Sequence, residues 1–145
     1  MPSLSKILLA SGAVFVALQF VRCSHDNPPV TGEIAAPANV KSILERACYD
    51  CHSNETVWPW YSHVAPVSWL IHHDVEEGRE HLNFSEWAAL PRSERVHALE
   101  EIHEHAVEEA DMPLSHYLPL HEDARVSDAD KQVLKSWIAE AKAAP

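Results

Sequence analysis

Glycine, cysteine and strand-like patterns are all scarce in this sequence. The 145 residues include only three glycines and three cysteines, against ten prolines. Apolar and polar residues nowhere alternate over a length that would form a β-strand. Many prolines beside few glycines favour helices joined by stiff turns. Because a chain of this length forms one domain, we expect a small all-α domain.

Positive charge is scarce as well. Eleven lysines and arginines stand against 22 aspartates and glutamates, which gives a formal charge of −11. Such a chain repels the phosphate backbone, so nucleic acid is not expected as a partner. No Ser/His/Asp set or carboxylate pair can be placed in one site, so we expect no catalytic residues of the hydrolytic kind.

Two of the three cysteines are closely spaced. Cys48-Tyr49-Asp50-Cys51-His52 has the pattern C-x-x-C-H, the attachment sequence of covalently bound haem c. Helical residues three apart are rotated by about 300° and rise about 4.5 Å, so Cys48 and Cys51 face the same side and both can bond to one ring. His52 can then bind the iron from the proximal side. The motif predicts one covalent haem.

A closely spaced cysteine pair has two other common uses, a redox pair and a zinc site. A thioredoxin-like redox pair lies at a strand-to-helix junction, and the sequence has no strand pattern. A structural zinc site of the four-cysteine kind needs a second pair, whereas the remaining cysteine, Cys23, follows an apolar N-terminal segment. A mixed Cys/His zinc site is the weaker alternative that stays open.

Methionine is rarer still, with only Met1 and Met112. Met112 lies between Asp111 and Pro113, after a long helical pattern and before an irregular stretch. This placement favours a thioether ligand on the distal side of the haem iron. A methionine that only fills the core is the alternative. His103, on the apolar stripe of the preceding helical pattern, is the competing distal ligand.

Aromatic residues are concentrated just after the cysteine motif. Trp58, Trp60 and Tyr61 surround Pro59 within an irregular stretch. A proline-broken aromatic cluster at this place predicts a loop that lines the haem pocket. Each of these side chains could instead fill the core. The two roles are compatible, because the porphyrin would be a large part of the core in so small a domain.

The N-terminus carries the only long apolar run. Residues 7–21 lie between Lys6 and Arg22, a pattern typical of an export signal. The residues that follow are too large and too charged for a signal peptidase site. Counted from Leu4 the run has about 18 residues, near the lower limit for crossing a hydrocarbon core of roughly 30 Å. We therefore expect residues 1–24 to stay attached as a signal anchor or transmembrane helix.

Beyond this run the sequence predicts a tether and a helical domain. Residues 25–37 are rich in proline and are expected to tether the domain of residues 38–145 to the membrane. Periodic apolar residues and cap signals place helices within the domain. The predicted helices cover residues 38–51, 67–78 with Gly78 as the C-cap, 91–110, and 128–141 after Ser127, with a further turn beginning at Ser85.

Longer stretches of the sequence carry a resemblance. CYDCHSNETVWPWYSHVAPVSWL, DVEEGREHLNFSEW, DMPLSHYLPLHEDARVS and the tryptophan-containing terminal helix are similar to the bacterial haem-binding domain family of small exported cytochrome-c-like proteins. The similarity covers residues 38–141. It implies one covalent haem in a helical domain at the periplasmic side of the membrane. Cys48 and Cys51 match the thioether positions, His52 the proximal ligand, and Met112 the methionine of the family's M-P segment.

Taken together, these observations predict a cytochrome-c-like helical domain around one covalent haem c, preceded by an N-terminal anchor helix. We expect a carrier of single electrons, rather than a catalyst, at the periplasmic face of the bacterial inner membrane. The expected partners are a redox protein and the membrane. A peroxidase or a gas or redox sensor with an open distal site is the alternative if Met112 does not bind. An accessory domain of a larger membrane complex and a soluble periplasmic form are further alternatives.

Overall fold

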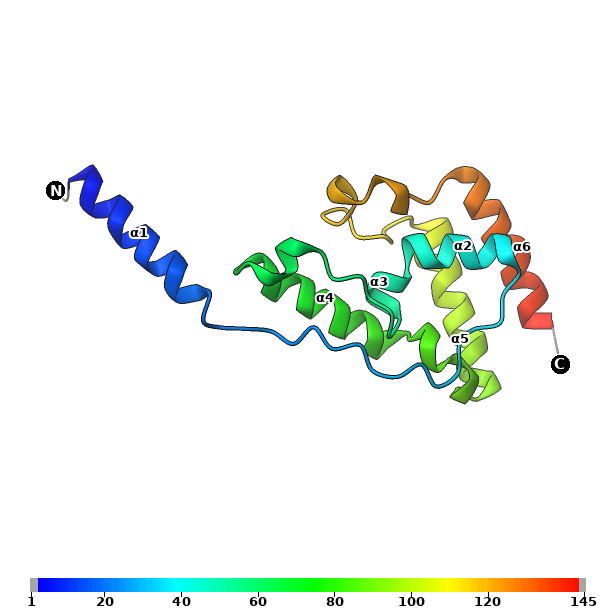
Figure 1. The fold of residues 1–145 in the computed structure, drawn as a ribbon. Helices are drawn as coiled ribbons and strands as arrows, with labels where there is room; N and C mark the ends of the chain where they lie inside the picture. The colour runs from blue at the N-terminus through cyan, green and yellow to red at the C-terminus, as the bar shows by residue number, and fades with distance from the viewer. Residues whose placement is uncertain (1–2, 144–145) are drawn as a thin grey trace.

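Helices and turns make up all the regular structure within the part of the chain that the computed structural model describes, residues 3–143 (Figure 1). The predicted all-α class is confirmed. Met1 and Pro2 of the predicted anchor lie outside the described residues, as do residues 144–145. The elements are α1 (Leu4–Leu18), α2 (Ala38–Ala47), α3 (Tyr49–His52), η1 (Trp60–His63), α4 (Val67–His81), η2 (Phe84–Ala89), α5 (Arg92–Ile102), η3 (His103–Glu108), η4 (Leu118–Leu120), η5 (Glu122–Ala124) and α6 (Asp128–Ala143).

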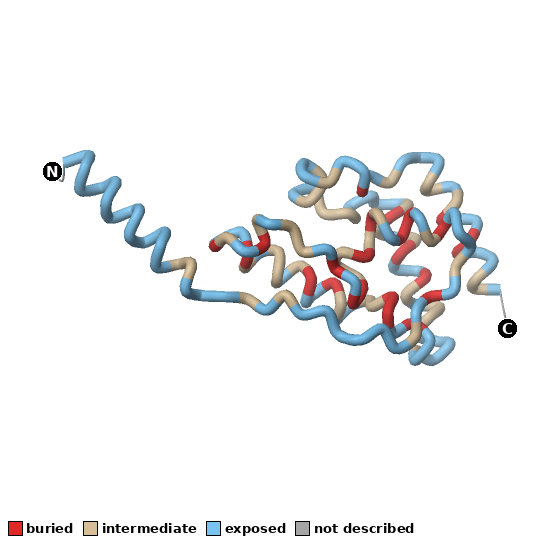
Figure 2. The backbone as a smooth tube through the Cα atoms, in the orientation of Figure 1, coloured by how far each residue is buried: buried red, intermediate tan, exposed pale blue. Residues whose placement is uncertain are grey.

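Helix α1 projects from the rest of the molecule and buries none of its residues (Figures 1 and 2). Leu9, for example, is 74% exposed. Within residues 3–143, no helix is long and apolar enough to cross a membrane. The predicted transmembrane helix is therefore not supported. The helix ends at Leu18, next to Gln19, whose side-chain amide donates to Ala65 O at 3.1 Å and accepts from Ala65 N at 3.0 Å.

The proline-rich segment 25–37 is extended and lies along the domain instead of standing free of it. The N–H groups of Thr31 and Gly32 donate to Ser85 O at 3.1 and 2.9 Å, and the N–H of Ile34 donates to Phe84 O at 3.0 Å. Ile34 is only 3% exposed and belongs to the core. The segment is held in place because it gives an apolar side chain to that core.

Arg79 of α4 fixes the beginning of the same segment. Its guanidinium donates to Asp26 O at 3.0 Å and to Asn27 Oδ1 at 2.7 Å. On its other side it donates to Ser53 O at 2.8 Å and to Thr56 Oγ1 at 2.9 Å. One planar side chain therefore joins the N-terminal segment to the residues that follow the cysteine motif.

The hydrophobic core lies between α2, α5, α6 and η2, and buried positions gather there in Figure 2. Burial of these apolar side chains is the main stabilising contribution, at roughly 25 cal/mol per Å² removed from water. This packing fixes the position of α2, and the cysteine motif begins with Cys48 directly after the C-terminal end of that helix. The core includes Val40, Ile43, Leu44, Phe84, Trp87, Leu99, Ile102, Ala106, Leu134, Trp137 and Ile138.

Two helical predictions need correction. The helix of residues 67–78 continues to His81, so Gly78 lies inside α4 and is not its C-cap. The helix of residues 91–110 is divided into α5 and the π-helix η3. The wider π turn changes which side chains face inward: Ile102 and Ala106 are buried, whereas His103 is half-buried.

The predicted start of the terminal helix is confirmed. Helix α6 begins at Asp128, directly after Ser127. The Ser127 hydroxyl accepts from Asp130 N at 3.2 Å, while the Asp130 carboxylate accepts from Ser127 N at 2.9 Å. This reciprocal pair satisfies N–H groups that a helix N-terminus leaves unpaired.

Candidate functional site

The cysteine motif occupies one short turn between two helices. Helix α2 ends at Ala47, and Cys48 leaves the helical region with φ −126° and ψ −34°. The continuous helix that we predicted through the motif is therefore interrupted. The N–H groups of Cys51 and His52 both donate to Cys48 O, at 3.2 and 2.8 Å. The turn α3 thus keeps the two cysteines in the helical i, i+3 relation that two bonds to one ring require.

The imidazole of His52 is oriented by the backbone of α4. Its Nδ1 lies 2.8 Å from Gly78 O and 3.1 Å from Leu82 O. Because a carbonyl oxygen can only accept, Nδ1 carries the proton and donates it, which leaves Nε2 with the free lone pair. Burial lowers the pKa of His52 and favours the neutral ring. A neutral imidazole with an anchored Nδ1–H is the form that ligates iron.

Gly78 allows α4 to approach the motif closely. A Cβ atom at this position would lie 2.6 Å from Cys51 O and 3.1 Å from Cys51 Cβ. Real Cβ contacts are longer, so any side chain here would push α3 and α4 apart. The same glycine supplies a carbonyl to His52. Gly78 therefore allows the backbones of α3 and α4 to come into close contact.

The environment of the two cysteines disfavours thiolate chemistry. Cys48 and Cys51 are half-buried and are not joined in a disulfide. Burial, with a smaller contribution from Cys51, raises the pKa of Cys48 to about 12. Burial, followed by Asp74 and Asp50, raises the pKa of Cys51 to about 12. Thiol–disulfide exchange proceeds through a thiolate, so the raised pKa values disfavour the redox pair. The mixed Cys/His zinc site stays an alternative.

A segment distant in sequence lies against the motif. We call residues 111–121 the distal segment, because it contains the predicted distal ligand. The Tyr117 hydroxyl donates to Asp50 Oδ2 at 2.7 Å, and His116 Nε2 lies 2.8 Å from Asp74 Oδ2. Asp50 belongs to α3 and Asp74 to α4. The distal segment is therefore attached to both elements that hold His52.

Met112 lies at the beginning of the distal segment and is half-buried. Its N–H donates to His105 O at 3.3 Å, and the His105 ring lies 3.1 Å from Asp111 Oδ1. Ala110, with a positive φ of 54°, turns the chain out of η3 just before it. His103 lies at the start of η3, with Nδ1 3.6 Å from Glu108 Oε1. The choice between Met112 and His103 as the distal ligand stays a prediction.

The three predicted pocket aromatics lie in different surroundings. The Trp58 ring packs edge-on against His25 at 4.7 Å, and Trp58 Nε1 is the one buried side-chain N or O atom within residues 3–143 that has no hydrogen-bond partner. Trp60 is 77% exposed. The Tyr61 hydroxyl lies 3.1 Å from His121 Nε2 in the distal segment. Their role as a haem pocket stays a prediction.

Sequence reasoning missed several residues that build this site. Asp50, inside the motif, accepts from the Tyr117 hydroxyl. Gly78, predicted as a C-cap, lies against Cys51, and the His121 ring lies 3.1 Å from the Tyr61 hydroxyl. Two signals in the sequence could have pointed to these residues. One is a single glycine within a helical pattern, and the other is a charged residue between the two cysteines.

Comparison with protein families gives one match. The haem-binding domain family matches residues 13–140 of the chain. The chain belongs to this family. No curated protein and no solved structure matches it. The matched residues of the haem-binding domain include the cysteine motif, α4 and the distal segment. Family membership supports haem as the cofactor, and the anchored neutral ring of His52 fits that group.

Proposed function

We propose that this haem-binding domain is a monohaem c-type cytochrome-like carrier of single electrons. The observation that carries the proposal is the imidazole of His52, whose Nδ1–H is fixed by Gly78 O and Leu82 O. This leaves the lone pair of Nε2 available for a metal, one residue after a suitably spaced cysteine pair, which supports the proposal. Haem, when bound, supplies a one-electron iron couple.

Each residue has a distinct part in this proposal. Cys48 and Cys51 would hold the ring through thioether bonds, and His52 would bind the iron on the proximal side. Met112 would supply a soft sulfur ligand on the distal side, which raises the reduction potential relative to two histidines. The acidic surface, with a formal charge of −11 for the whole chain, favours a redox partner with a basic docking face.

Absorption spectra of the purified haem-loaded protein test the proposal. We expect the weak charge-transfer band of a thioether bound to ferric iron, and a ferrous form that binds carbon monoxide poorly. Met112→Ala should abolish the band, whereas the control His103→Ala should keep it. If His103→Ala removes the sixth ligand and Met112→Ala does not, the ligand assignment is wrong. If the wild-type ferrous form is high-spin and binds carbon monoxide readily, the carrier function is wrong. Such a result would favour a peroxidase or a sensor.

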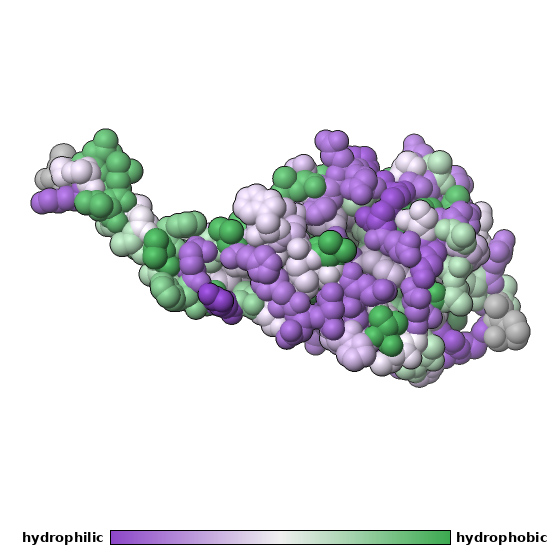
Figure 3. Space-filling model, viewed as in Figure 1, coloured by the Kyte–Doolittle hydropathy of each residue, from purple (hydrophilic) through white to green (hydrophobic). Residues whose placement is uncertain are grey.

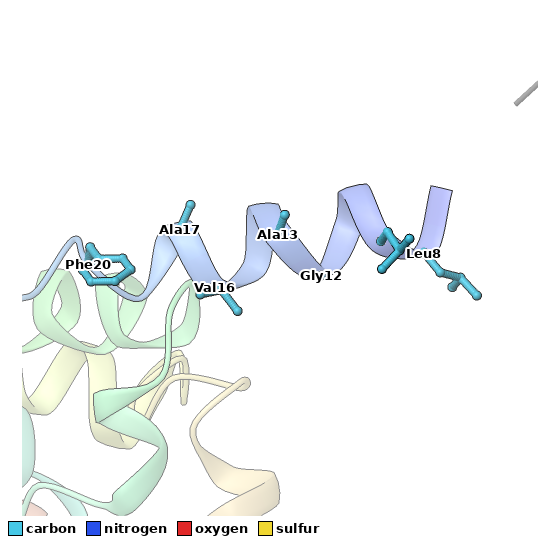
Figure 4. Close-up of a pocket in the computed structure, with 7 residues that line it drawn as sticks. Leu8, Gly12, Ala13, Val16, Ala17 and Phe20 are labelled. Carbon is cyan, nitrogen blue, oxygen red and sulfur yellow. The ribbon is translucent and has the colours of Figure 1, made fainter. Parts of the chain in front are cut away.

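We further propose that the protein is exported and acts at the periplasmic face of the inner membrane. The support is the N-terminal helix, whose apolar side chains are exposed beside a largely hydrophilic domain surface (Figure 3). Apolar and small side chains of this N-terminal region are drawn in Figure 4. Membrane fractionation with N-terminal sequencing tests this location. A soluble product that lacks residues 1–24 would favour cleavage of the signal. The residues drawn in Figure 4 are Leu8, Leu9, Gly12, Ala13, Val16, Ala17 and Phe20.

A further inference from the structure

A chain of hydrogen bonds joins the distal segment to the middle of the cysteine motif. The Tyr117 hydroxyl donates to Asp50 Oδ2 at 2.7 Å. The other carboxylate oxygen, Asp50 Oδ1, accepts from Val57 N at 2.9 Å, and Asp50 O accepts from the Thr56 hydroxyl at 2.8 Å. Asp50 is thus fixed by its own neighbours. It offers the distal segment a rigid acceptor between the two cysteines.

Tyr117 is itself held from the opposite side. Its ring stacks on His121, with ring centres 3.8 Å apart and planes within 6°. His121 Nδ1 lies 3.1 Å from Tyr117 O, so this nitrogen donates to the carbonyl. Nε2 is then an acceptor, and the Tyr61 hydroxyl donates to it at 3.1 Å. The network locks the tautomer of His121 and the direction of the Tyr117 hydroxyl together.

Tyr117 is also well suited to remain a donor. The residue is half-buried, and burial, followed by its hydrogen bond to Asp50, raises the pKa of the phenol above its ordinary value. The hydroxyl is therefore protonated throughout the physiological range. Hydrogen bonds to a carboxylate are among the stronger ones in proteins. Tyr117 thus supplies a hydroxyl hydrogen bond from the distal segment to α3.

We propose that Tyr117 is the positioning residue for the distal ligand: its bond to Asp50 holds the distal segment against α3 and so keeps Met112 on the iron. This inference rests on the proposed function and adds how the distal side is kept closed. Tyr117 is five residues from Met112 and touches neither Cys48, Cys51 nor His52 through a hydrogen bond. It acts through the position of the backbone that carries Met112.

The test compares two tyrosine-to-phenylalanine variants of the full haem-loaded chain. Tyr117→Phe removes the bond to Asp50 and keeps the ring stack. Tyr49→Phe is the matched control, because Tyr49 is buried inside the motif and also donates to a carboxylate, Glu33 Oε1, at 3.2 Å. Both variants should keep one haem per chain by mass. Only Tyr117→Phe should weaken the thioether charge-transfer band, lower the potential and increase carbon monoxide affinity about tenfold.

A double-mutant cycle separates this role from general stability. Asp50→Ala should weaken the band as Tyr117→Phe does, and the double variant should be no worse than either one. Tyr117→Phe with an unchanged band and unchanged carbon monoxide affinity would overturn the positioning role and leave the carrier function intact. A wild-type protein with covalent haem and no thioether band would also overturn it. A wild-type chain without haem would overturn the carrier function itself.

Discussion

At the scale of single residues, the site depends on a few backbone contacts around His52. Gly78 O and Leu82 O both accept from the imidazole, and the absence of a side chain at Gly78 brings the α4 backbone against Cys51. The ring of His52, the proposed proximal ligand, is therefore oriented by α4 and by Leu82 directly after it, and not by its own turn. The two-fold use of one glycine makes this position unusually sensitive to substitution.

Gly78→Ala should destabilise the protein and reduce the yield of haem-loaded chain. The new Cβ would lie 2.6 Å from Cys51 O, and relieving this overlap should cost about 1–3 kcal/mol. Gly12→Ala is the matched control, because nothing lies within 4 Å of a Cβ there and alanine favours a helix. Urea unfolding and haem content per chain measure both effects. Equal stability of the two variants would contradict the close-contact role.

Only part of this site could be predicted from the sequence. The cysteines and His52 are found by spacing alone, because one turn contains them all. The partner of the His52 ring could not be found in this way, since Gly78 reaches it only through tertiary packing. Tyr117 and Asp50 present the same difficulty, because no local pattern shows which carboxylate a distant hydroxyl will meet.

At the scale of secondary-structure elements, local signals predicted helix ends well where a cap defines them. Ser127 marks the start of α6 because its side chain and that of Asp130 pair with each other's N–H groups. The π-helix η3 has no such signal, and it displaces the apolar stripe on which His103 was placed. Packing of Ile102 and Ala106 into the core decides that geometry.

Asp130→Asn should destabilise α6 by about 1 kcal/mol at neutral pH. The carboxylate binds Arg46 at 2.6 Å as well as capping the helix. Burial raises the pKa of Asp130, but the hydrogen bonds from Ser127 and Arg46 outweigh it, so the net pKa lies below 3.8. A lowered pKa gives stability that is present above about pH 4 and lost as the pH falls through the folded value.

Urea unfolding at neutral pH and near pH 3 checks this linkage. The difference between wild type and Asp130→Asn should shrink on acidification. Asp128→Asn is the control, because Asp128 is exposed in the same first turn but does not bind Arg46. An Asp128→Asn variant as unstable as Asp130→Asn would mean that general first-turn charge, and not the cap and ion pair, stabilises α6.

At the scale of the whole molecule, the two parts of the N-terminal quarter of the chain are related differently to the domain. Helix α1 buries nothing, whereas residues 25–37 contribute Ile34 to the core and backbone hydrogen bonds to η2. The apolar run and the proline-rich segment could both be recognised from the sequence. The packing of the proline-rich segment against the core could not be predicted, because an isolated isoleucine between prolines gives no periodic signal.

Two truncated chains, each behind a cleavable export signal, should therefore behave differently. A chain that begins at Ser24 should bind haem with nearly unchanged stability, since the domain loses the hydrogen bonds of Ala65 to Gln19 and of Trp69 to Val21 but no core side chain. A chain that begins at Pro37 should lose at least about 2 kcal/mol, because Ile34 and its backbone bonds are removed. Urea unfolding compares them. Equal stability of both chains would show that residues 25–37 do not stabilise the domain.

The most direct test of the whole account is the intact mass of the denatured protein from cells competent in haem attachment. The account predicts the mass of the mature chain plus one haem, and a Cys48→Ala/Cys51→Ala variant that releases any haem on denaturation. Haem staining of a denaturing gel should agree. A wild-type mass equal to the bare polypeptide, with haem lost into acidified organic solvent, would contradict attachment at Cys48 and Cys51.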